Sequence, residues 1–319
     1  MSTPPLKAID ARGAALALIV SVLWGANPVA IKLALEDTPP IRLAWMRFLL
    51  GGAVIVVWAC LTGRWRGWRI ARDEWGPLLV LGALFTAQIG TMNVATGLTS
   101  AAHAAVLLNL YAVHTVVLAH FLIPGDRLTA RRLAGVLIAY AGTVMLFWRH
   151  EGAGLPTLLG DVVMFASGLI LAERTVYLAR AVHPFDAVKL LLSQAAMGTT
   201  VFLVTSAIFE TEPTRWTWRL VGSLGYQGVV IAGFNFVVNL WLLERYRPSA
   251  LATFFLTQPI FGVVAAGIVA GEHLTADVFV ASAAVAVGIG LVNVGPRFRP
   301  VGPRSRPAGP RSRPVGPKV

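Results

Sequence analysis

Apolar runs of about 20 residues follow one another along almost the whole chain, and a helix needs about that length to cross a hydrocarbon layer. Of the 319 residues, 56% are hydrophobic and 13% are charged, whereas ordinary soluble domains carry roughly 25% charged residues. So few charges cannot provide the polar surface that a soluble protein of this size needs. The sequence therefore predicts an all-α membrane protein.

Ten membrane spans are predicted from the positions at which these runs end. Asp37-Thr38-Pro39-Pro40 ends the first run, because proline cannot continue a helix. The first run is longer than the apolar part of a signal peptide, so we interpret it as a retained helix. The predicted spans are Gly13–Leu35, Leu43–Leu61, Pro77–Thr99, Ala101–Ile123, Leu133–Trp148, Leu158–Leu178, Ala187–Phe209, Leu220–Leu243, Ala250–Ala270 and Ala276–Val294.

The stretch Leu251–Ala276 has an earlier counterpart at Ala105–Ala130, shifted by 146 residues. The pairs that match at this shift include Gly82/Gly228, Asn93/Asn239, Ala104/Ala250, Asp126/Glu272 and Gly142/Gly288. Each half contains five spans, an odd number, so a repeated second half enters the membrane from the opposite face. Inverted repeats of this kind characterise many secondary transporters, with the substrate site between the halves. The pattern predicts two inverted five-helix repeats, and chance recurrence of small residues is the alternative.

The net charge of +12 is concentrated in the C-terminal residues and in short loops, which argues against a nucleic-acid partner. Residues 295–319 are rich in proline, glycine and arginine, which predicts a disordered tail able to attract anionic lipid. Most of the remaining arginines follow even-numbered spans, and the positive-inside rule then places both termini in the cytoplasm. These arginines are Arg64, Arg66, Arg69, Arg72, Arg127, Arg131, Arg132, Arg180, Arg245 and Arg247.

These features divide the chain into five predicted parts. They are a cytoplasmic leader at 1–12, a first repeat at 13–148, a loop at 149–157, a second repeat at 158–294 and the tail at 295–319. We expect a multi-pass protein of the cytoplasmic membrane whose partners are a small-molecule substrate and the lipid bilayer. A homodimer is an open alternative to a single copy.

Sequence motifs for covalent and ATP-driven chemistry are missing. No Gly-x-x-x-x-Gly-Lys-[Ser/Thr] segment occurs, which excludes an ATP pump within this chain. The single cysteine, Cys60, excludes an intramolecular disulfide and a cysteine-built metal site. Ser223 stands in Gly222-Ser223-Leu224-Gly225, the wrong spacing for a serine nucleophile. We therefore expect no enzyme activity, no metal and no cofactor.

Five short motifs occur in order along the chain. They are Leu23-Trp24-Gly25-Ala26-Asn27-Pro28, Met46-Arg47-Phe48, Gly125-Asp126-Arg127-Leu128, Gln258-Pro259 and Gly271-Glu272-His273-Leu274. Together they resemble the motifs of the drug/metabolite transporter superfamily, in its EamA branch. In that family the corresponding motifs are a first-helix motif, an Arg-Phe in helix two, two Gly-Glu-Arg-Leu signatures and a proline in helix nine. The resemblance covers about Gly13–Val294 and implies a ten-helix fold of two inverted repeats that exports amino acids, other metabolites or toxic compounds. In the first half Val113 stands where Pro259 stands in the second, so the fourth span lacks that proline.

Polar and aromatic side chains within the apolar runs are candidates to line a substrate pathway, because polar groups are costly in hydrocarbon and usually face a cavity or a partner. Packing or hydrogen bonding between helices is the alternative for each of them. The candidates are Trp24, Asn27, Arg47, Asn93, Asn109, Tyr111, His114, Glu173, Tyr177, Asn235, Asn239, Gln258 and Pro259.

Four of these candidates have specific expected roles. Trp24 and Asn27 lie three residues apart on one helix face, as an apolar wall and a hydrogen-bonding group. Arg47 is expected to pair with an acid or to attract an anionic group of the substrate. Pro259 is the expected hinge, because proline removes a backbone hydrogen bond near the middle of the predicted ninth span.

The fourth span carries a polar band of Asn109, Tyr111 and His114, which we expect to set selectivity. His114 either titrates near neutral pH or is satisfied by a neighbouring group. If transport is coupled to protons, Glu173 and His114 are the candidate groups.

Charged and amide side chains near the span ends receive structural interpretations. Lys32 is expected to extend to the membrane interface. Asp161 and Glu272 are expected to cap the starts of the sixth and tenth helices. Asn93 and Asn239 are interpreted as a symmetric pair facing the centre of the protein.

The function predicted from these observations is a secondary active transporter that exports small metabolites, amino acids or drug-like compounds by alternating access. A membrane channel or a non-transporting assembly protein is the alternative, and saturable counterflow of a labelled solute separates a carrier from both.

Overall fold

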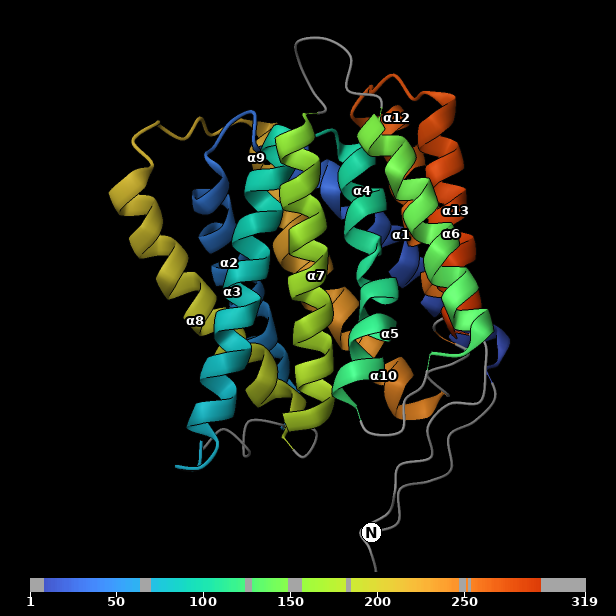
Figure 1. Ribbon diagram of the computed structural model, residues 1–319. Helices are drawn as coiled ribbons and strands as arrows, with labels where there is room; N and C mark the ends of the chain where they lie inside the picture. Colours follow the sequence, from blue (N-terminus) through green and yellow to red (C-terminus); the bar gives the residue numbers. More distant parts are fainter. Residues whose placement is uncertain are drawn as a thin grey trace, which may run out of the picture.

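Figure 1 shows the computed structural model of the chain, in which helices run side by side between two ends of one bundle. The structure describes residues 9–63, 70–123, 128–148, 157–181, 185–246, 251 and 254–293. The predicted tail, most of the leader and of the loop at 149–157, and the arginine-rich loop at 64–69 lie outside these residues, as does Asp126. Within the described residues the predicted all-α class is confirmed.

The helices keep the labels of Figure 1. They are α1 (Ala11–Ala34), α2 (Pro40–Leu61), α3 (Trp75–Leu98), α4 (Ala101–Asn109), α5 (Tyr111–Leu122), α6 (Ala130–Trp148), α7 (Leu158–Ala181), α8 (Ala187–Phe209), α9 (Trp218–Gly225), η2 (Tyr226–Asn235), α10 (Phe236–Arg245), α12 (Gln258–Val269) and α13 (Ala276–Asn293). We call the end of the bundle where α9 begins the α9 end, and the end where α10 stops the α10 end. They lie at the top and the bottom of Figure 1.

Local sequence signals determine where several helices begin. A side-chain oxygen accepts a hydrogen bond from a free backbone amide in the first turn of α1, α4, α8 and α9, which is the usual N-terminal cap. The capping residues are Asp10, Ser100, Asp186 and Thr217, at 2.7 to 3.1 Å from the donating nitrogen. The helix α2 opens with Pro40, where a missing amide hydrogen costs nothing.

Eight helical stretches among the described residues are long and apolar enough to cross a membrane. Large apolar side chains on the outside of the bundle are exposed, among them Leu49, Leu79, Leu137, Ile208 and Val287, and lipid tails suit such a surface. The chain is therefore a multi-pass membrane protein. The helices α7, which carries several charged side chains, and α12, which has 12 residues, are not among the eight, so ten spans remain a prediction.

The predicted spans Ala101–Ile123 and Ala250–Ala270 are each interrupted by a turn among the described residues, although Ala101–Leu122 is long and apolar enough to cross a membrane. Leu110 separates α4 from α5 and donates its amide hydrogen to the Leu107 carbonyl in a tight turn. Before α12, Leu256 and Thr257 form a similar turn. Leu110 and Leu256 are 146 residues apart, the shift of the sequence repeat.

Proline does not explain both helix breaks. Pro259 lies in the first turn of α12, where its missing donor is not needed, so it starts a helix rather than kinking a continuous one. At the other break the Asn109 side chain donates to the Ala105 carbonyl at 2.7 Å. Asparagine competes with helical backbone bonding in this way, and it provides a local reason for α4 to end without proline.

The eighth predicted span, Leu220–Leu243, contains an unpredicted π-helix, η2, between α9 and α10. Such wide turns are rare and are found mostly at functional sites. Three polar side chains of η2 donate to backbone carbonyls of α1, at distances of 2.6 to 3.3 Å. They are Tyr226, Gln227 and Asn235, which bond to Leu23, Ala30 and Val20. The eighth span is thereby tied to α1 along its length.

Glycine allows α1 and α12 to meet backbone to backbone. A Cβ atom at Gly25 would lie 2.6 Å from the Gln258 carbonyl oxygen, and one at Gly262 would lie 2.8 Å from the Gly25 oxygen. These distances are too short for any side chain. The glycine of the Trp24-Gly25-Ala26 motif is therefore required for this crossing, which places the start of α12 against the middle of α1.

Candidate functional site

The two helix breaks lie at one cavity of about 180 Å³. Asn109 and Tyr111, on either side of Leu110, line it together with Phe255, which precedes Leu256. Its polar lining is completed by Thr115 of α5 and by Thr175 and Asn293, which belong to the last turns of α7 and α13, towards the α10 end. We call this space the break cavity. The structure thus brings two of the three residues of the predicted polar band to a cavity between the halves.

A second, smaller cavity of about 20 Å³ lies among α2, α3, α7, α8, η2 and α10, with room for about one water molecule. Its lining includes Phe48, Phe85, Arg174 and Phe236. We call it the aromatic cavity. Apart from Arg174 and one glutamine, its lining is apolar.

Trp24 lies between the two cavities. Its ring meets Phe236 edge to face at 6.1 Å between centroids and Phe255 at 5.8 Å. Phe236 lines the aromatic cavity and Phe255 lines the break cavity. The half-buried tryptophan therefore contacts one lining residue of each cavity.

Two arginines flank a pair of phenylalanine rings inside the bundle. The Phe48 and Phe85 centroids are 4.8 Å apart. The Arg47 guanidinium carbon lies 4.6 Å from the Phe48 ring, and that of Arg174 lies 5.1 Å from the Phe85 ring, within the range of cation–π attraction. Arg47 is only 5% exposed.

Neutral glutamines are the hydrogen-bond acceptors of both guanidinium groups. Arg47 donates to the Gln227 side-chain oxygen at 3.1 Å, and Arg174 donates to that of Gln88 at 3.3 Å. The predicted acid partner of Arg47 is not found among the described residues. Arg174 was not among the sequence candidates, because its neighbour Glu173 and its place near a predicted span end favoured an interfacial position. The sequence feature that could have identified Arg174 is a charged residue within an apolar run.

His114 of α5 is 1% exposed and surrounded by rings. It stacks on Tyr140 at 5.6 Å and meets Phe165 edge to face at 4.8 Å. Its ring lies next to Gly168 of α7, and the Gly168 backbone is a polar neighbour of the imidazole among the described residues. Both expectations for His114, a titrating group and a histidine satisfied by a neighbour, stay predictions.

The asparagines of the predicted pair lie near opposite ends of the bundle. Asn93 is fully buried near the α9 end and donates to the Pro40 carbonyl at 3.0 Å, whereas Asn239 belongs to α10. Asn93 and Asn235 thus serve contacts between helices.

The remaining candidates are not gathered at the two cavities. Tyr177 of α7 donates to the Pro77 carbonyl at 3.5 Å. Glu173 is half-buried, and the Oδ1 of buried Asn27 has no partner among the described residues. Gln258 and Pro259 are buried at the start of α12.

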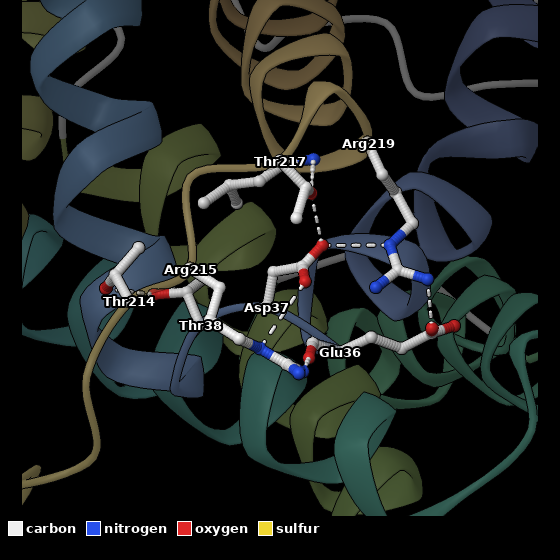
Figure 2. Close-up of polar contacts among 8 residues, drawn as sticks. Glu36, Asp37, Thr38, Thr214, Arg215, Thr217 and Arg219 are labelled. Atoms are coloured by element: carbon white, nitrogen blue, oxygen red, sulfur yellow. Dashed lines mark hydrogen bonds and ion pairs between the residues drawn. The ribbon is translucent and has the colours of Figure 1, made fainter.

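A polar cluster at the α9 end joins the two halves of the chain (Figure 2). We call it the α9-end cluster; its residues are Glu36, Asp37, Thr38, Thr214, Arg215, Thr217 and Arg219. The buried Asp37 carboxylate accepts hydrogen bonds from Thr217 Oγ1 at 2.6 Å and from Arg219 Nε at 2.9 Å. The hydroxyl oxygens of Thr38 and Thr214 are 3.0 Å apart. Arg219 also forms an ion pair with Glu36.

Two glutamates at the same end cap helices of the other half. Glu210 accepts from the amides of Ile41 and Arg42 at the start of α2, both at 2.7 Å. Glu272 accepts from the first amides of α4 at 2.6 and 3.0 Å. The prediction that Glu272 caps its own following helix is therefore wrong. Free amides and the helix dipole attract any nearby carboxylate, and the nearest helix start in space belongs to the first half.

The prediction for Asp161 is also wrong. Asp161 is fully buried and bonds to His103 Nδ1 at 2.8 Å, while Thr157 caps α7. The Lys32 ammonium group reaches the end of α3 and donates to carbonyls there, with the shortest bond, 2.7 Å, to Thr99. These contacts satisfy carbonyl groups that a helix end leaves free.

Acidification is expected to weaken the α9-end cluster. Hydrogen bonds from Arg219 and Thr217 hold the pKa of the Asp37 carboxyl below its ordinary value of 3.8. A lowered pKa in the folded protein means that the ionised carboxylate stabilises the fold above the unfolded pKa, and that this is lost as the pH falls through the folded value. We expect Asp37→Asn to be less stable than the wild type at neutral pH. On acidification below about pH 4 the variant should lose less stability than the wild type, because it has no carboxylate to protonate at this position.

Thermal unfolding of the purified protein between about pH 3 and pH 7 measures this difference. Glu212→Gln is the control, because Glu212 is exposed and its carboxylate has no hydrogen bond or ion pair among the described residues; it should keep the wild-type pH dependence. Parallel pH curves for wild type and Asp37→Asn would contradict the assignment.

Several curated proteins are similar to the chain over most of its length. A protein of Archaeoglobus fulgidus described as an uncharacterized transporter is 27% identical over 78% of this chain and 86% of its own. A protein of Escherichia coli K12 named a probable amino-acid metabolite efflux pump is 26% identical over 89% of this chain and 95% of its own. The E. coli K12 inner membrane transporter YedA is 25% identical over 89% of this chain and 90% of its own.

A solved crystal structure shares the fold, with a TM-score of 0.65 at 20% identity over 88% of this chain and 95% of that chain. The model of the EamA-like transporter family matches residues 11–148 and again residues 158–294. The chain therefore belongs to the EamA-like transporter family and is a membrane transporter.

Proposed function

We propose that the protein is a secondary active exporter that works by alternating access and binds a small metabolite in the break cavity. The observation that carries this proposal is the pair of helix breaks at Leu110 and Leu256, 146 residues apart, whose neighbours line one cavity. In transporters built from inverted repeats, substrate sites are formed where helices of the two halves are interrupted near the midplane. Interrupted helices also leave backbone groups available to a ligand.

Helix neighbours support the inverted repeat. If α1 corresponds to α7 and α12 to α4, the packing of α1 against α12 is repeated by that of α7 against α4. In the same way, the packing of α2 against η2 is repeated by that of α8 against α3. A two-fold relation between the halves produces such paired contacts, and the family match in each half agrees with it.

The proposed direction is export, and two observations support it. The arginine-rich loops place the α10 end in the cytoplasm, and Thr175 and Asn293 of the break-cavity lining lie towards the α10 end. An exporter must load its substrate from the cytoplasm. The printed names of similar proteins include an efflux pump, which favours the same direction.

Tyr111→Ala is expected to lower export at least tenfold, because Tyr111 lines the break cavity beside Leu110. The matched control is Phe121→Ala: Phe121 is an aromatic residue of the same helix, 75% exposed, and its loss should change export less than twofold. Mass spectrometry of the culture medium, with cells expressing each variant at equal levels, measures the exported metabolites. Equal export by the two variants, or no metabolite that depends on the wild type, contradicts the proposal.

Proton coupling through Glu173 or His114 is part of the proposal. Efflux of the metabolite identified in this way, measured from proteoliposomes under pH gradients of both signs, should then depend on the sign of the gradient. Unchanged efflux in both directions rules the coupling out and leaves the export proposal standing.

A further inference from the structure

We infer that the transported solute is a small organic anion, with a carboxylate that binds Arg174 and an apolar body that packs against aromatic rings. This inference rests on the proposed transport function and adds a substrate class to it. It starts from the two guanidinium groups inside the bundle.

A guanidinium group in a membrane interior is costly unless a counter-charge or a polar ligand stabilises it. No carboxylate contacts Arg47 or Arg174 among the described residues, and their side-chain acceptors are neutral glutamines. The planar guanidinium presents paired donors that match the two oxygens of a carboxylate. A substrate carboxylate would therefore supply the charge that the protein itself does not provide here.

Arg174 is the guanidinium group associated with both cavities. Its side chain lines the aromatic cavity, and Thr175, the next residue of α7, lines the break cavity. Arg174 is therefore the guanidinium group that we assign to a solute bound in the break cavity.

The lining selects an apolar body without a cationic group. Tyr111 and Phe255 face the break cavity, which at about 180 Å³ can hold that body. The aromatic cavity, at about 20 Å³, has room only for a group of about the size of one water molecule, such as a carboxylate oxygen beside Arg174. Neither cavity is lined by a carboxylate among the described residues, so a substrate ammonium group would have no counter-charge. The same lining therefore disfavours cations and binds zwitterions less well than anions.

Arg47 offers a second position for the anion on the other side of the aromatic pair. It lies near the start of α2, towards the α9 end, whereas Arg174 lies in the part of α7 that approaches the α10 end. The order Arg47, Phe48, Phe85, Arg174 follows from the ring distances of 4.6, 4.8 and 5.1 Å. An anion that moves past the rings of Phe48 and Phe85 would therefore leave the guanidinium group of one arginine and bind that of the other.

Three probes that share a phenyl ring test the charge preference directly: 3-phenylpropionate, phenylalanine and phenethylamine, as anion, zwitterion and cation. Binding to the purified full-length protein in detergent is measured by calorimetry and by thermal shift, since a ligand stabilises the state that it binds. We expect the anion to bind at least tenfold more tightly than the cation, with the zwitterion between them. Equal affinity for the three probes, tighter binding of the cation, or no detectable binding of the anion overturns the inference.

Variants test the assigned residue. Arg174→Gln should weaken anion binding at least tenfold, Arg174→Lys should retain part of it, and Arg131→Gln should leave it unchanged, because Arg131 is exposed at the start of α6. Anion binding that survives in Arg174→Gln overturns the assignment; if that variant does not fold, Arg174→Lys and the wild-type probe series decide.

Transport is scored separately from binding. Export of a metabolite without a carboxylate contradicts the substrate class and leaves the transporter intact. Anion binding that depends on Arg174 without any export or counterflow contradicts the proposed transport function and leaves the anion site standing.

Discussion

A disulfide between Thr38→Cys and Thr214→Cys is expected to abolish transport, and reduction is expected to restore it. The hydroxyl oxygens of the two threonines are 3.0 Å apart across the two halves of the chain (Figure 2), which places the side chains within reach of an S–S bond. Alternating access requires the α9 end to open, and a covalent bond there holds it closed. Solute counterflow in proteoliposomes, before and after addition of a reductant, measures the effect.

The background for this experiment is Cys60→Ser, because Cys60 is the one cysteine of the sequence. Each single-cysteine variant, treated with the same oxidant, should transport at the rate of the background. Full transport by a protein that mass spectrometry shows to be cross-linked would mean that the α9 end does not open, and alternating access through this end would be wrong.

Gly288→Ala is expected to cause a large loss of stability. The helices α6 and α13 cross where Gly288 meets Gly135, and a Cβ atom on Gly288 would lie 2.5 Å from the Gly135 carbonyl oxygen and 2.6 Å from the Ala139 Cβ. Backbone atoms cannot move aside as a flexible side chain can, so the helices must separate. Overpacking of this kind costs roughly 1–3 kcal/mol or more.

The matched control is Gly290→Ala, two residues further along the same helix. The nearest atom to a Cβ there is a Leu256 methyl carbon at 3.6 Å, an ordinary contact. Alanine favours a helix over glycine by about 1 kcal/mol, so this variant should be as stable as the wild type or more stable. Thermal unfolding and the yield of monodisperse protein separate the two variants. Equal stability would mean that the α6–α13 crossing is not as close as described.

Short-range signals were readable in the sequence. The helix α8 begins and ends at the predicted Ala187 and Phe209, and α2 ends at the predicted Leu61 but begins at Pro40, three residues before the predicted Leu43. The break at Leu110 was not predicted, because no proline marks it and the neighbouring Asn109 also fitted a pathway role. The period and length of an apolar run predict a helix, but not whether that helix is continuous.

Contacts between the halves could not be read in the same way. Glu272 lies next to the start of α13 in the sequence, and the sequence neighbour was the natural choice for its cap. In space its carboxylate reaches the first amides of α4. Arg174 likewise looked interfacial beside Glu173, and only the packing of α7 against α3 places it on Phe85. A carboxylate or guanidinium group pairs with whatever lies within a few ångströms, regardless of separation along the chain.

The sequence by itself determined the class of this protein, because a chain that is 56% hydrophobic and 13% charged has no stable arrangement in water but satisfies every backbone group as helices in lipid. It also revealed the pattern shared by the two halves, and the match of the same family model to each half agrees with it. The tertiary structure alone decided which side chains meet at the centre. Cavities, helix breaks and guanidinium groups come together through contacts between segments that lie far apart in the sequence, such as the 180 residues between Arg47 and Gln227, and no local pattern encodes which segments those are.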